Sequence, residues 1–156
     1  MRRVVISVIA LAIATLPASA KKPSPPPPLP KPIALAIHRL VGEFIDCGIF
    51  YSMAHSSLEW STTSANVARE RYEKASKQMF GFAANAAAQI DLKEAALQAQ
   101  VVQLKKRQLD VISGNIANFA VLAERYDKIC TELKRDPGDR LRALTLEANT
   151  NLAKQR

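Results

Sequence analysis

Proline is concentrated in the first 32 residues of this 156-residue chain, and that distribution constrains the fold more than any other feature. Seven of the nine prolines lie between Pro23 and Pro32, whereas residues 33–136 contain no proline and only four glycines. A β-sandwich or barrel needs turn residues every 8–12 positions, while long helices need interiors without proline or glycine. A hydrophobic content of 48% argues against a disordered chain. We therefore expect one all-α domain.

The first twenty residues have the three-part pattern of a cleavable signal peptide. Arg2 and Arg3 provide a positive start, residues 4–16 are apolar, and Ala18-Ser19-Ala20 is a cleavage site of small residues. The apolar run is too short for a membrane span, which needs about 20 residues. We expect cleavage after residue 20 and a periplasmic product without a transmembrane span. Loss of the two arginines lowers the net charge from +8 to +6.

Residues 21–32 are rich in proline and carry three lysines. Such a run favours the extended polyproline II conformation and spans about 37 Å at roughly 3.1 Å per residue. It has the form of a PxxP ligand, but the modules that bind such ligands are mostly intracellular. We interpret it as a stiff basic spacer that leads to a helical domain at residues 33–136.

Apolar residues in the proline-free span recur in steps of three and four, which places them on one side of a helix. Such stripes cover residues 37–58 and 65–90, and two more follow at 97–104 and 109–133. Asp91-Leu92-Lys93-Glu94 has the pattern of a capping box before the third stripe. The last two stripes are nearly continuous, so the pattern alone leaves open whether residues 91–134 form one helix or two.

The two cysteines, Cys47 and Cys130, favour two helices. An exported protein with two cysteines most economically pairs them, and the alternative of a redox pair lacks a Cys-x-x-Cys motif. One helix over residues 91–134 would be about 65 Å long and would carry Cys130 far beyond the first helix. The chain should therefore reverse at Ser113-Gly114-Asn115. These constraints predict an up-down-up-down four-helix bundle with a disulfide between its first and fourth helices, followed at residues 137–156 by a short helix or tail.

A tyrosine lies one helical turn from each cysteine, in the mirrored motifs Cys47-x-x-x-Tyr51 and Tyr126-x-x-x-Cys130. On antiparallel helices both rings would lie on the same side of the disulfide, either as core packing or as a ligand-binding pair. These motifs, with the signal peptide and Pro137, resemble a loose group of uncharacterised small helical proteins exported by Gram-negative bacteria. The resemblance implies a periplasmic helical domain and no activity.

The residues offer little for enzymatic chemistry. His38 and His55 would lie about 260° apart around one helix, so they cannot bind one metal or haem together. The chain has no Cys-x-x-Cys-His, no Glu-x-x-His and no glycine-rich phosphate loop. We therefore expect no catalytic residues, metal or cofactor.

Positive charge is densest at Lys105-Lys106-Arg107. Export argues against nucleic acid as the partner, and interspersed charges usually form a solvated helix face. The alternative is contact with an anionic component of the cell envelope, including the surface of a membrane. We expect a non-enzymatic protein that binds a periplasmic partner as an inhibitor, immunity factor, chaperone or assembly component. The alternative is a carrier of a small ligand, held inside the bundle near Tyr51 and Tyr126.

Overall fold

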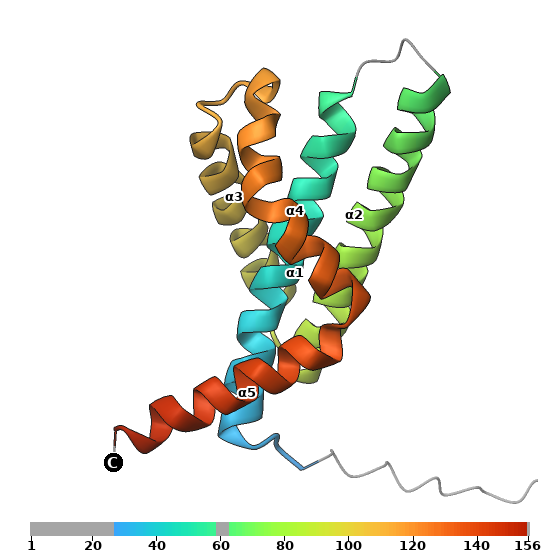
Figure 1. Cartoon of the computed structure of the whole chain (residues 1–156). Coiled ribbons are helices and arrows are strands. Elements are labelled where there is room, and N and C mark those ends of the chain that lie inside the picture. Colours follow the sequence, from blue (N-terminus) through green and yellow to red (C-terminus); the bar gives the residue numbers. More distant parts are fainter. Residues whose placement is uncertain (1–26, 59–62, 156) are drawn as a thin grey trace, which may run out of the picture.

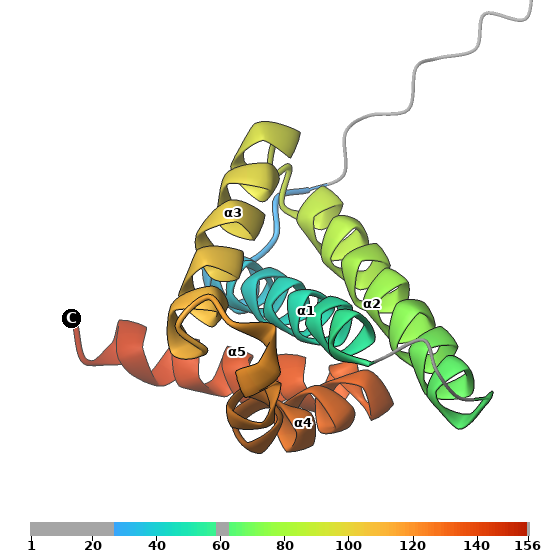
Figure 2. The same cartoon turned by 90° about the horizontal axis from the view of Figure 1, so that it is seen from above.

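Helix α1 (Lys31–Ser57) lies at the centre of the fold, and the other helices pack against it. In the computed structural model, which describes residues 27–58 and 63–155, α1 is surrounded by α2, α3, α4 and α5 (Figure 2). Its 27 residues give it a length of about 40 Å. It is apolar on nearly all sides, and a helix of that kind must be enclosed by neighbours. Its buried residues are Ala36, Ile37, Leu40, Val41, Phe44, Ile45, Cys47, Gly48, Ile49, Phe50, Tyr51, Met53 and Ala54.

The helices that surround α1 follow in chain order, as Figure 1 shows. They are α2 (Thr63–Gln89), α3 (Glu94–Val111), the short 3₁₀ helix η1 (Ile116–Asn118), α4 (Phe119–Arg135) and α5 (Pro137–Ala153). The predicted all-α class is confirmed over the described residues. Within these ranges no helix has the length and apolar character needed to cross a bilayer. Residues 1–26, which include the predicted signal peptide, lie outside the described part.

The start of α1 lies two residues inside the predicted proline-rich spacer, which was expected to extend to residue 32. Lys31 is the first helical residue and Pro32 occupies the first turn, where the missing N–H would have had no partner. Pro30 precedes the helix with φ −53° and ψ 137°, which is polyproline II geometry.

The predicted chain reversal at Ser113-Gly114-Asn115 is confirmed. Ser113 and Gly114 have φ of 53° and 69°, and the N–H of Gly114 donates to the carbonyl of Leu109 at 2.8 Å. This pattern ends a helix with left-handed residues. The predicted capping box at Asp91 was wrong: Asp91 itself is left-handed, with φ 51°, and α3 begins at Glu94.

The predicted four-helix bundle is not confirmed, because the structure contains a fifth helix of 17 residues. Helix α5 begins at Pro137, and its N-cap Asp136 accepts a hydrogen bond from the N–H of Asp139 at 2.9 Å. Leu144 and Ala148 are buried, and α5 crosses the first half of α1 (Figure 1). The helices therefore gather around α1 rather than around a shared central core, and α2 packs chiefly on α1.

Candidate functional site

Residues Glu43–Gly48 of α1, here called the hub segment, contain a specific link to each of the four surrounding α-helices. Towards α2, the hydroxyl of Ser76 donates to the carbonyl of Gly48 at 2.9 Å. Towards α3, the amide Nε2 of Gln108 donates to the backbone carbonyl of Asp46 at 2.8 Å and to its Oδ1 at 3.1 Å. The links to α4 and α5 form the two sides of the candidate site.

The link to α4 is covalent. Cys47 and Cys130 form a disulfide with their Cα atoms 5.3 Å apart, and both residues are buried. The predicted disulfide and its placement between the first and fourth helices are confirmed. It fixes the second half of α4 against the middle of α1.

The link to α5 is an ion pair with two hydrogen bonds. Arg140 donates from Nε to Oε2 of Glu43 at 2.7 Å and from Nη2 to Oε1 at 2.5 Å. The hydrogen bond to Glu43 raises the pKa of Arg140. One turn earlier on α1, Arg39 pairs with Glu147 at 2.8 Å. Because Arg39, Glu43 and Cys47 are spaced by four residues, they lie on one side of α1.

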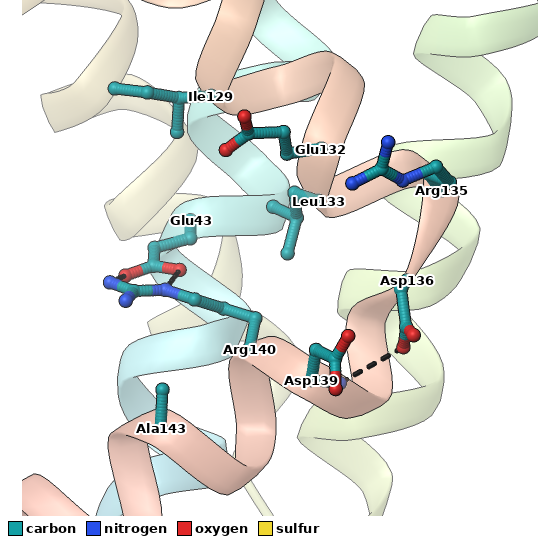
Figure 3. Close-up of a pocket in the computed structure, with 9 residues that line it drawn as sticks. All are labelled: Glu43, Ile129, Glu132, Leu133, Arg135, Asp136, Asp139, Arg140 and Ala143. Atoms are coloured by element: carbon teal, nitrogen blue, oxygen red, sulfur yellow. Dashed lines mark hydrogen bonds and ion pairs between the residues drawn. The ribbon is translucent and has the colours of Figure 1, made fainter.

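A groove of about 490 Å³ lies between α4 and α5, beside this side of α1 (Figure 3). Ile129, Leu133 and Ala143 provide its apolar surface, and Ile129 remains 55% exposed. Its charged lining carries both signs: Glu43, Glu132, Arg135, Asp136, Asp139 and Arg140. The disulfide holds one wall and the Glu43–Arg140 pair holds the other, so the groove is fixed in the protein alone.

The connection between the two walls is also ordered by charge. The backbone N–H of Asp139 keeps the pKa of Asp136 below its ordinary value, so Asp136 stays an ionised helix cap. Asp139 pairs in turn with Arg142. The first turn of α5, which closes one end of the groove, is therefore held by its own side chains.

Tyr51 and Tyr126 are both buried, and the ring of Phe50 contacts each of them. The ring centroids lie 5.2 Å from Phe50 to Tyr51 and 6.0 Å from Phe50 to Tyr126. Burial raises the pKa of Tyr51, and the side chain of Thr131 beside its hydroxyl opposes that rise. Lys134 lies over the Tyr51 ring, 5.4 Å from its centroid. The tyrosines pack in the core, and their proposed role as a ligand pair remains a prediction.

The three residues of the predicted basic cluster on α3 differ in their contacts. Lys105 and Lys106 are exposed, whereas Arg107 forms an ion pair with the partly buried Asp46 of the hub segment. Burial raises the pKa of Asp46, and the contacts with Gln108 and Arg107 oppose that rise. Arg107 therefore joins α3 to α1, and a role of the cluster in binding an anionic partner stays a prediction.

The two histidines lie apart on α1. His38 is exposed, while Nε2 of His55 lies 3.4 Å from Nη2 of Arg69. The other guanidinium nitrogen of Arg69, Nη1, donates to the carbonyl of Leu58 at 2.7 Å. Over residues 27–58 and 63–155, no group of histidine, cysteine, aspartate and glutamate side chains is arranged to hold a metal ion.

The sequence reasoning missed the polar links of the hub segment, although a signal for them is present. Asp46 is the one charged residue in the apolar run from Phe44 to Ile49. Gln108 falls on the apolar stripe between Leu104 and Ile112, and it is fully buried. One helix thus has a polar residue on its apolar stripe, and another has a charged residue within an apolar run. Together they indicate a buried polar contact between the two helices.

Comparisons of the chain with protein-family models, with curated proteins and with solved structures gave no match.

Proposed function

We propose that this chain is an exported, non-enzymatic helical protein that binds a periplasmic protein through the groove between α4 and α5. The observation that carries the proposal is a groove with both walls fixed to α1, one by Cys47–Cys130 and the other by Glu43–Arg140. A site that is already ordered before binding loses less conformational entropy when its partner arrives.

The charges of the groove favour a polypeptide as the occupant. An exposed isoleucine and an alanine offer apolar contact, while Glu132 and Arg135 on α4 present opposite charges one turn apart. A lipid surface or nucleic acid presents charge of one sign and would meet repulsion from Glu132 and Asp136. A protein segment can match both signs and fill the apolar part.

The test is capture from periplasmic extract with a matched pair of variants. Ile129→Asp places a charge in the groove, and Val102→Asp places the same charge on α3 at a valine that is exposed as well. We expect wild type and Val102→Asp to retain one protein in stoichiometric amount and Ile129→Asp to lose it. A photoreactive side chain at position 129 should crosslink to that same protein.

Two results would overturn the proposal. The first is equal capture by the two aspartate variants, because binding would then not depend on the groove. The second is a crosslinked partner that differs from the captured one. Circular dichroism of both variants provides the control for folding.

A further inference from the structure

A second groove, of about 270 Å³, lies between α1, α2 and α5 on a different part of the surface. None of the described residues that line it carries a charge. The rings of Phe44 and Phe82 lie 5.4 Å apart in its wall, and the amides of Asn85 and Gln89 are exposed beside them. The groove therefore combines aromatic surface with amide groups that can donate hydrogen bonds.

This combination suits a polyproline II ligand. Such a helix has no internal hydrogen bonds, so its carbonyls are free to accept from side-chain amides. Its prolines present a rigid apolar surface, and known proline-rich ligands bind in grooves lined by aromatic rings.

The chain carries a ligand of this class at the start of the described part. Residues 27–30 have the sequence Pro-Pro-Leu-Pro, all four are exposed, and Leu29 is 40% exposed. Pro30 has polyproline II geometry. Figure 2 shows these residues leaving α1 on the side away from α5. They therefore leave α1 away from the wall of the groove that α5 forms.

We infer that the proline-rich segment around Pro27–Pro30 of one molecule binds in the groove between α1, α2 and α5 of a second copy. The contact joins two molecules through unlike surfaces, and it is independent of the groove between α4 and α5. A contact of this size gives weak association, with Kd in the micromolar to millimolar range.

Sedimentation velocity over a range of concentrations tests the inference. The wild-type protein should shift reversibly from monomer towards dimers and larger species, because each dimer keeps one free segment and one free groove. A synthetic peptide of residues 21–32 in excess should return it to monomer. Asn85→Arg blocks the groove at an exposed position and should weaken self-association by about tenfold or more in Kd. Asn66→Arg, at another exposed position of α2, is the matched control and should leave it unchanged.

A mixing experiment separates lost binding from lost folding. Asn85→Arg keeps the proline-rich segment, while Leu29→Asp damages the segment and keeps the groove. Each variant should be monomeric alone, and their mixture should form a one-to-one dimer because one intact segment meets one intact groove. A variant that had simply misfolded could not be rescued in this way.

Three results would overturn the inference: a wild-type protein that stays monomeric at millimolar concentration, a mixture that gives no dimer, or equal weakening by Asn66→Arg and Asn85→Arg. If the peptide binds the groove but the full chain stays monomeric, the groove takes a proline-rich segment of another protein instead.

Discussion

Removal of the Cys47–Cys130 disulfide should lower the stability of this protein by about 4.5 kcal/mol. The two cysteines are separated by 83 residues, and the loss of loop-closure entropy in the unfolded chain gives that value at 25 °C. Domains are usually stable by only about 5–15 kcal/mol, so the disulfide contributes a large share. We expect the melting temperature to fall by roughly 15 °C or more.

The measurement is urea unfolding of the double variant Cys47→Ala/Cys130→Ala, followed by circular dichroism. Alanine avoids the unpaired hydroxyls that serine would bury at these two positions. The midpoint should fall and the m-value should rise, because the unfolded chain without the crosslink exposes more surface. Either single variant breaks the same crosslink, so each should lose nearly as much stability as the double variant.

Lys128→Ala serves as the control, because Lys128 lies two residues before Cys130 on α4 and is exposed; it should change stability by less than about 0.5 kcal/mol. A loss of about 1 kcal/mol or less in the double variant, with an unchanged m-value, would refute the reasoning. The ordering of α4 would then depend on its apolar packing and not on the disulfide.

Three further changes probe the hub segment. Gly48→Ala places a Cβ 3.0 Å from the Phe80 ring and should lower the free energy of unfolding by about 1 kcal/mol in thermal unfolding. In the control Gly42→Ala the added Cβ meets nothing within 4 Å, so the free energy of unfolding should rise by about 0.5–1 kcal/mol. Equal effects of the two substitutions would contradict this. Glu43→Gln should lower the free energy of unfolding by about 1 kcal/mol and speed hydrogen exchange in α5 but not in α2. Unchanged exchange in α5 would contradict the role of the Glu43–Arg140 ion pair in holding that helix. Burial raises the pKa of Asp46, so the folded state binds the proton of this carboxyl more tightly than the unfolded state does. As the pH falls from about 7 to about 4, wild type should therefore gain stability relative to Asp46→Asn. A difference in stability that stays constant with pH would contradict this.

The sequence allowed the helices and the disulfide to be predicted because both follow from local spacing and one distance argument. Steps of three and four placed the first four α-helices, and the reach of a disulfide required the reversal at Ser113–Asn115. Residues 137–156 were left open as a short helix or a tail, and the structure has a helix of 17 residues there. The centre of the fold was missed because one apolar stripe was assigned to the first helix. Val41, Ile45 and Phe50 lie off that stripe and are fully buried. Apolar residues on all sides were the available sign of a central helix.

The grooves could not be predicted in the same way. Periodicity shows which face of a helix is buried, but it does not show which helix covers that face. The groove between α4 and α5 depends on the crossing of α5 over α1, which Arg140 and Glu43 fix across 97 positions of sequence. No local pattern pairs these two residues, because each is a charged residue of the kind that usually lies on a solvated helix face.

Since the outer helices are joined to α1 more than to one another, loss of one link should release one helix and leave the others in place. Reduction of Cys47–Cys130 frees the wall of the groove that carries Ile129, while α2 keeps its link through Ser76 and α5 keeps its ion pair. Below the melting temperature of the reduced protein, we therefore expect partner capture to fall while most helicity remains. Hydrogen exchange should rise in α4 and stay low in α2. Capture that survives reduction would show that a fixed α4 wall is not needed for binding, which would remove the main argument for that groove.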